Sequence, residues 1–258
     1  MKLATAPVNW NSPDVPEYRA YTPLGGFVGL ELRNPDKREQ EVKKGAEIGE
    51  YFQSLGASYL IAADSGDPRR VQEAGRVNPA GGLTDVQWES LGGGLNELGA
   101  LLKPAGVRLV FHNHVGTYVE TEAETCRLLD ATDSALVGWC LDCGHLTYGG
   151  GDTLRMMQKY GDRVGYVHIK DVDAELLRRS REEGWSFHEA LKRFIFPRLG
   201  EGMVNIPALI RALKDDRYDG WLVVEQDTTP DNPTTIAKEN RLYLEVLLKS
   251  ETQSGENG

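Results

Sequence analysis

The stretch VRLVFHNH (residues 107–114) joins a short apolar run to two histidines. Three further runs have the same design. ALVGWCLDCGH (135–145) and VGYVHIKD (164–171) end in Asp, His or Lys, and GWLVVEQD (220–227) ends in carboxylates. Apolar strands that finish in such side chains are typical of a parallel β/α barrel, whose functional site gathers at the carboxyl ends of the strands. These four runs therefore predict a barrel with a site at one rim, as enzymes of this architecture have.

The rest of the chain alternates short apolar runs with longer amphipathic ones, which is typical of repeated βαβ units around a parallel sheet. Several of the short runs are nearly continuous in apolar residues, as a sheet covered on both faces requires. The pattern therefore predicts an α/β fold of the (β/α)8 TIM-barrel class. The seven predicted strands span residues 2–7, 26–32, 58–63, 107–113, 136–142, 164–170 and 220–226.

An eight-unit barrel needs one more βα unit than these runs supply. Parallel neighbours are joined by a crossover of about a dozen or more residues, usually a helix. Residues 8–24, between the first two predicted strands, contain three prolines and no helical period of apolar residues. We therefore expect that the barrel lacks, or does not show, one βα unit after its first strand.

Helix boundaries are marked by capping signals. A Thr followed three residues later by Gln or Glu can form a capping box, and an Asn can cap alone. One predicted helix contains three successive glycines at 92–94, each costing ~1 kcal/mol relative to Ala, and the sequence gives no reason for them. The predicted capping residues are Thr84 with Gln87, Thr121 with Glu124, and Asn205.

No linker or internal repeat divides the chain, so residues 1–250 are predicted to form one domain, followed by a flexible, polar tail at 251–258. The charged and largely helical segment 174–196 is inserted after a predicted strand end. In a barrel such an insertion lies on the face that carries the site, where we expect it to form a lid.

Composition narrows the class of partner. The chain has 258 residues, a net charge of −10 and 40% hydrophobic residues. This acidity argues against nucleic acid and anionic membranes, which reward clustered Lys and Arg. A small-molecule ligand fits this composition better than either of them. The composition does not decide whether the protein forms a homo-oligomer. Three cysteines are too few for a disulfide framework, and with no targeting or membrane-spanning run we expect a cytoplasmic protein.

Three side chains at predicted strand ends form a candidate metal site: Asp142, His168 and Glu225. A single histidine in such a position is more often structural, but charged groups gathered at a barrel rim rarely lack a function. The mixture of imidazole and carboxylate favours a transition metal over a purely oxygen-liganded ion. We expect one divalent ion, Mn²⁺ or Co²⁺ first, with Zn²⁺, Fe²⁺ and Mg²⁺ as alternatives.

The same strand ends carry groups that can transfer protons. In HNH the strand period of two directs His112 and His114 to one face and Asn113 to the other. His168 and Lys170 share a face for the same reason. The candidate catalytic residues are Glu225, His112 and His114 as bases, and His145 and Lys170 as acids.

Other polar motifs favour simpler interpretations. Glu120 suits the start of a helix better than a metal site. Cys140 and Cys143 have CxxC spacing, but no second pair exists and Cys140 is expected in the packing around its strand, so zinc or redox use is not favoured. The glycines at 149–151 predict a flexible loop and not a phosphate cradle.

The motifs together resemble the xylose-isomerase-like sugar isomerase/epimerase superfamily, and within it the inosose dehydratases of inositol catabolism. The resemblance covers nearly the whole chain from residue 25 onward plus the first strand. It rests on APVNWNSPDVPE (6–17), FHNHVGTYVET (111–121), LDCGHLTYGGGD (141–152), HIKDV (168–172), FPRLGEGMVN (196–205) and VVEQD (223–227).

The resemblance implies a (β/α)8 barrel with one divalent metal near the strand ends. Asp142, His168 and Glu225 match the superfamily's metal positions. His112 replaces the glutamate that is usually the first ligand there, which makes it the candidate fourth metal ligand. His145 matches a residue that usually contacts substrate. Family members also continue after 21–23 with a helix, a strand and another helix that this chain does not show.

The expected reaction is the dehydration of a cyclic keto-polyol. The metal would stabilise an enediolate formed when a base removes the proton next to the ketone, and an acid would protonate the departing hydroxyl. A ketose epimerase or aldose–ketose isomerase would use the same enediolate without losing water. Epimerases usually need two acid/base groups, and one clear rim glutamate favours elimination. An inactive sugar-binding barrel is the alternative from another class.

Overall fold

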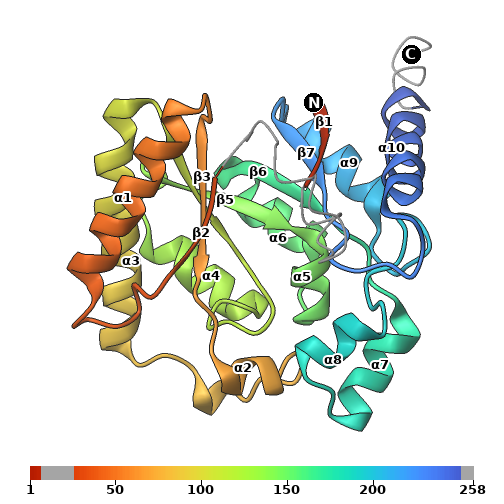
Figure 1. The fold of residues 1–258 in the computed structure, drawn as a ribbon, viewed down its shortest axis with the longest axis horizontal. Helices are drawn as coiled ribbons and strands as arrows, with labels where there is room; N and C mark the ends of the chain where they lie inside the picture. The colour runs from red at the N-terminus through yellow and green to blue at the C-terminus, as the bar shows by residue number, and fades with distance from the viewer. Residues whose placement is uncertain (7–25, 251–258) are drawn as a thin grey trace.

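The computed structural model describes residues 1–6 and 26–250. Its centre is a seven-stranded sheet in the order β1-β7-β6-β5-β4-β3-β2, and every neighbouring pair is parallel (Figure 1). Each of the seven predicted strands is present. Their bounds are β1 Lys2–Thr5, β2 Gly26–Leu30, β3 Tyr59–Asp64, β4 Arg108–His112, β5 Val137–Asp142, β6 Val164–Ile169 and β7 Trp221–Val224.

Many of the helices pack beside the strands, and others lie beyond one end of the sheet (Figure 1). Both predicted capping boxes are formed, at Thr84 and at Thr121, and Asn205 accepts a hydrogen bond from the backbone N of Ala208. The helices are α1 Arg38–Ser54, α2 Pro68–Gln72, α3 Asp85–Leu102, α4 Glu122–Ala131, α5 Cys143–Tyr148, α6 Thr153–Tyr160, α7 Ala174–Glu183, α8 Phe187–Lys192, α9 Ile206–Asp215 and α10 Pro233–Ser250.

Strand alternation divides the buried residues into two clusters. On β5, Trp139 and Leu141 belong to the large cluster between sheet and helices, whereas Cys140 belongs to a small inner cluster with Val110 and Tyr166 of the neighbouring strands. Asp142 has the same parity as Cys140, so its side chain also points inward. The inner face of the sheet therefore changes from apolar to polar toward the carboxyl ends of the strands.

Close packing explains most of the unusual glycines in α3. A Cβ at Gly92 would lie 3.1 Å from the backbone O of Ala131, and one at Gly99 would lie 2.6 Å from the backbone O of Leu136. Gly93 differs, because a Cβ there would meet only the end of a flexible arginine side chain. These glycines let α3 approach the neighbouring backbone.

The open side of the sheet lies between β1 and β2. Within the described residues β1 pairs with β7 and β2 pairs with β3, and no described strand lies between them. The described part of the chain thus contains seven of the eight strands that a (β/α)8 barrel has. The predictions for residues 8–24 and for the tail at 251–258 lie outside the described residues. In the described ranges no helix is long and apolar enough to cross a bilayer.

Candidate metal centre

The ends of four consecutive strands bring together His112, Asp142, His168 and Glu225. His112 and Asp142 are the last residues of β4 and β5, His168 lies near the end of β6, and Glu225 directly follows β7. Each residue offers one ligand atom, and these atoms lie within 4.8 Å of one another. The four candidate metal ligands, His112 among them, are therefore neighbours.

The spacing of these atoms fits one shared ion. His112 Nε2 lies 3.0 Å from His168 Nδ1 and 3.4 Å from Asp142 Oδ2, and His168 Nδ1 lies 3.3 Å from Glu225 Oε2. Ligand atoms bound at ~2.1 Å to one ion lie ~3.0–3.5 Å apart. Asp142 Oδ2 is also buried and accepts no hydrogen bond from any described residue. A divalent cation would satisfy this oxygen.

Strand pairing and one amide fix the positions of the ligands. In the sheet register Asp142 is opposite His168, whereas His112 is opposite Cys140, one level deeper. Asn113 points outward, as predicted, and its side chain accepts a hydrogen bond from Trp139 Nε1 at 3.0 Å. It also donates to the backbone O of Asp142 at 3.3 Å, which ties the ends of β4 and β5 together.

A buried lysine lies beside the four ligands. Lys170 Nζ donates hydrogen bonds to Asp227 at 2.9 Å and to His145 Nε2 at 3.0 Å, and it lies 3.2 Å from Glu225. Burial would lower the pKa of Lys170, but the carboxylates of Asp227, Asp142 and Glu225 outweigh burial and raise its pKa above the usual value. Lys170 is therefore held in its ammonium form. Burial opposes ionisation of Glu225, yet His168 and Lys170 hold the pKa of that carboxyl below its usual value.

His114 is a neutral imidazole with a fixed tautomer. Its Nδ1 lies 2.6 Å from the backbone O of Val115, and because a carbonyl oxygen only accepts, Nδ1 carries the proton. Nε2 is then the unprotonated nitrogen. Burial, helped by His112 and Lys170, lowers the pKa of His114 to about 3. The ring lies against His145, with centroids 3.9 Å apart.

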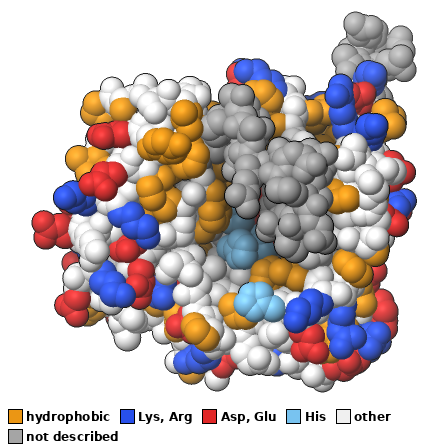
Figure 2. All heavy atoms as spheres, in the orientation of Figure 1, with side chains coloured by type: hydrophobic (Ala, Val, Ile, Leu, Met, Phe, Trp, Pro, Cys, Tyr) orange, Lys and Arg blue, Asp and Glu red, His pale blue; other side chains and the backbone are white. Residues whose placement is uncertain are grey.

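The predicted lid at 174–196 supplies an aromatic wall. It forms α7 and α8, and α8 lies between α2 and α7 at the end of the sheet where the ligands gather (Figure 1). The ring of Phe187 is 5.7 Å from those of His114 and His145, and Phe196 lies 4.8 Å from Lys170 Nζ. Figure 2 shows histidine and apolar side chains together in a hollow on this face. The insertion thus covers one side of the polar cluster with apolar surface.

The sequence pattern predicts most of this cluster but not all of it. Asp227 belongs to the motif VVEQD but has no predicted role, although its spacing from Glu225 repeats that of Lys170 from His168. The aromatic wall had no local signal. Glu120 lies outside the ligand group and accepts hydrogen bonds from the backbone N atoms of Gly75 and Gly116. Cys140 does lie in apolar packing, but its ligand atom is also within 4.8 Å of those of His112 and His168.

The chain belongs to the family of xylose isomerase-like TIM barrels, whose model matches residues 17–247. This match confirms the predicted fold class and superfamily. Inosose dehydratase of Geobacillus kaustophilus is 35% identical over 229 residues, which cover 86% of this chain and 73% of that protein. Inosose dehydratase of Clostridium perfringens is 30% identical over 95% of this chain and 96% of its own length.

Solved structures agree on the fold. The IOLI protein with a bound zinc atom has a TM-score of 0.67 at 18% identity, covering 94% of this chain and 97% of that one. L-ribulose 3-epimerase has a TM-score of 0.68 at 17% identity, covering 90% and 77%. At such low identity these likenesses concern the fold alone.

The alignment with the C. perfringens relative is longer than the part of this chain that it covers. It runs over 286 positions, whereas 95% of this 258-residue chain is about 245 residues, so about 41 positions in total face no residue of this chain.

Proposed function

We propose that this protein is a hydro-lyase that dehydrates a cyclic keto-polyol of the inosose type with the help of one divalent metal ion. The observation that carries the proposal is the convergence of four ligand atoms from His112, Asp142, His168 and Glu225. Relatives named inosose dehydratase, two of them aligned over most of both chains, supply the reaction class. They do not favour the alternatives of an epimerase, an isomerase or an inactive sugar-binding barrel.

The four ligands would hold Mn²⁺ or Co²⁺, because two imidazoles and two carboxylates suit these ions. Zn²⁺, Fe²⁺ and Mg²⁺ are weaker alternatives. When bound, the ion supplies Lewis-acid polarisation of the substrate's ketone. Asp142 and Glu225 supply two negative charges that balance the ion, and His112 and His168 supply neutral nitrogen ligands.

The remaining polar groups are assigned to proton transfer. His114 Nε2 is the proposed base that removes the proton next to the ketone, because the carbonyl of Val115 keeps the other nitrogen protonated. Lys170, held as an ammonium by its carboxylate neighbours, donates its proton to the departing hydroxyl, and His145 orients this ammonium. The carbon–oxygen bond breaks, water leaves, and the enol that remains becomes a diketone.

The test is direct assay of the protein loaded with Mn²⁺ or Co²⁺. With scyllo-inosose as substrate we expect ultraviolet absorbance from the enolised dione. Changed stereochemistry of the recovered substrate without that absorbance would replace this proposal with epimerisation. Unchanged substrate, with tight binding of the polyol, would replace it with a binding function.

A further inference from the structure

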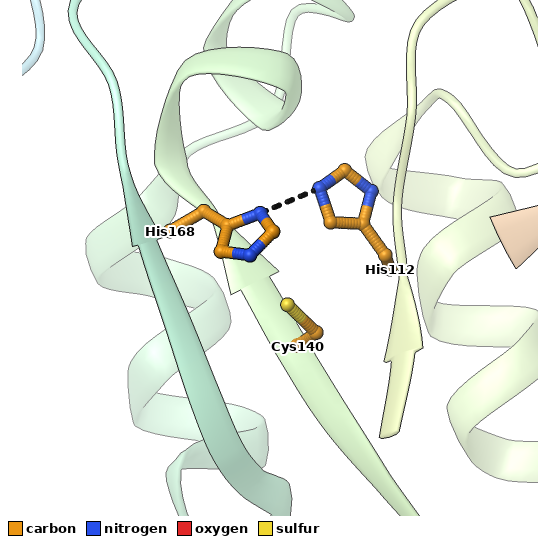
Figure 3. Close-up of side chains that lie close together, drawn as sticks. All are labelled: His112, Cys140 and His168. Atoms are coloured by element: carbon orange, nitrogen blue, oxygen red, sulfur yellow. Dashed lines mark hydrogen bonds between the residues drawn. The ribbon is translucent and has the colours of Figure 1, made fainter. Parts of the chain in front are cut away.

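A thiol lies directly beneath the candidate metal centre. Cys140 is two residues before Asp142 on β5, so both side chains point to the inner face of the sheet. Cys140, His112 and His168 each offer one ligand atom within 4.8 Å of the other two. Figure 3 shows the sulfur of Cys140 near both imidazoles, which are joined by a hydrogen bond. A second set of ligands therefore shares two members with the first.

The strand register places the two sets on different levels. His112 is paired with Cys140, and His168 is paired with Asp142 one level nearer the rim. The imidazoles of His112 and His168 nevertheless meet, with nitrogens 3.0 Å apart. An ion held by both imidazoles consequently has carboxylates on the rim side and a thiol on the inner side.

The surroundings of the two sets differ in chemistry. Cys140 packs among apolar side chains of the inner cluster, including Ile61, Val110 and Val223. The rim side offers carboxylate oxygens from Asp142 and Glu225. Thiolate and imidazole select soft or borderline ions such as Zn²⁺ and Cd²⁺, whereas carboxylate favours Mn²⁺. His112 and His168 thus belong to two ligand sets that prefer different metal ions.

We propose that Cys140 is a conditional metal ligand, which binds Zn²⁺ or Cd²⁺ together with His112 and His168. Binding displaces the thiol proton to solvent and forms a metal–sulfur bond. We call His112, Cys140 and His168 the inner set, and His112, Asp142, His168 and Glu225 the rim set. Both sets need the same two imidazoles, so an ion bound to the inner set excludes Mn²⁺ from the rim set. Thiophilic ions would then inactivate the protein by replacing its working ion. The inference rests on the proposed function only in taking the rim set as the working site.

The experiment uses the full-length protein, freed of metal and titrated with Cd²⁺ alone. A cadmium–thiolate bond gives a charge-transfer band in the ultraviolet difference spectrum, which is independent of enzyme activity. We expect the band in the wild type and its loss in Cys140→Ala, with Cd²⁺ affinity reduced ~10- to 100-fold and Mn²⁺ affinity nearly unchanged. Cys126→Ala, which removes a half-buried thiol on α4, is the matched control and should keep the band.

Cys140→Ser covers the case in which the alanine variant does not fold, because a hydroxyl nearly preserves the volume but does not replace a thiolate toward Cd²⁺. The inference is wrong if Cd²⁺ binds the wild type without the band, or if the band survives in the Cys140 variant that folds. If Mn²⁺ still binds and supports dehydration after either of these two results, Cys140 is not a metal ligand but the proposed function stands. If neither Mn²⁺ nor Cd²⁺ binds, the proposed metal centre is lost as well.

Discussion

At the scale of single residues, the position of His168 makes it the centre of the ligand group. Its Nδ1 lies 3.0 Å from His112 Nε2, 3.6 Å from Asp142 Oδ2 and 3.3 Å from Glu225 Oε2. This one atom thus lies within 3.6 Å of a ligand atom of each of the other three residues. Loss of this imidazole should therefore remove the central ligand and leave only three side chains to hold the ion, which weakens its binding.

We expect His168→Ala to lose bound metal and catalytic activity together. Elemental analysis after dialysis measures the metal, and the dehydration assay measures turnover. His188→Ala is the control, because His188 is exposed on α8 and lies outside the ligand group. A variant that keeps one ion per chain and full turnover would remove His168 from the proposed set.

Asp227 holds the ammonium of Lys170, with both carboxylate oxygens within 3.1 Å of Nζ. In Asp227→Asn the neutral amide weakens this contact, so we expect kcat to fall ~10- to 100-fold with a smaller change in KM. Steady-state kinetics on metal-loaded protein measures both constants. Asp231→Asn, at an exposed ion pair with Arg198, should leave them unchanged. Equal kinetics in the two variants would show that Asp227 does not orient Lys170.

At the scale of elements, the glycines of α3 show how helix propensity and packing compete. Gly99→Ala gains ~1 kcal/mol of helix propensity but forces a Cβ to within 2.6 Å of a backbone oxygen. The backbone must shift, so we expect a net loss of about 1–3 kcal/mol in the free energy of unfolding. Gly93→Ala is the matched control, because the arginine end beside it can move aside. Urea unfolding measures both, and equal stabilisation of the two variants would contradict the packing argument.

The insertion α7–α8 acts through the ring of Phe187, which touches His114, His145 and Tyr148. Phe187→Ala removes apolar cover from both histidines and admits water. We expect kcat/KM to fall ~10-fold while the metal content is unchanged, because Phe187 touches none of the four proposed ligands. Phe194→Ala, a partly exposed position in the same segment, is the control. Loss of metal in the Phe187 variant would instead make the insertion a support of the metal centre.

Local pattern was enough to predict the strands, because each is a short apolar run bounded by polar residues. It also predicted the capping boxes, which depend on residues three apart. The helix α5 has six residues, too few to show a helical period, and was not predicted. The strand ends identified Asp142, His168 and Glu225, but Phe187 and Phe196 reach the site only through the tertiary placement of the insertion. The closeness of Cys140 to His168 depends on inter-strand register, which one sequence does not specify.

At the scale of the whole molecule, the proposed ion would join four successive strands that helices and loops separate in the chain. A ligand that binds only the folded state stabilises it by about 2.7 kcal/mol when present at 100 times its Kd. For a chain of this size we expect a rise of about 5–10 °C in Tm on addition of Mn²⁺ to chelator-treated protein. Scanning calorimetry measures the shift. His168→Ala should show no such rise, and an equal rise in that variant would place the ion elsewhere.

The position of the proposed ligands in the sheet is also independent of the open side between β1 and β2. The four proposed ligands come from β4, β5, β6 and β7, which are neighbours in the sheet. The interruption between β1 and β2 lies outside this arc. Loss of a βα unit there removes no member of the ligand group.

The arc from β4 to β7 is continuous in sequence as well as in space. A cut in the backbone near Gly106, in the turn before β4, would leave every proposed ligand on the C-terminal fragment and none on the N-terminal one. The two portions of the chain therefore differ in what they contribute to the proposed site. The first contributes strands and helices to the barrel and the second carries all four proposed ligands, which makes this turn a suitable place to divide the protein into two separately expressed fragments.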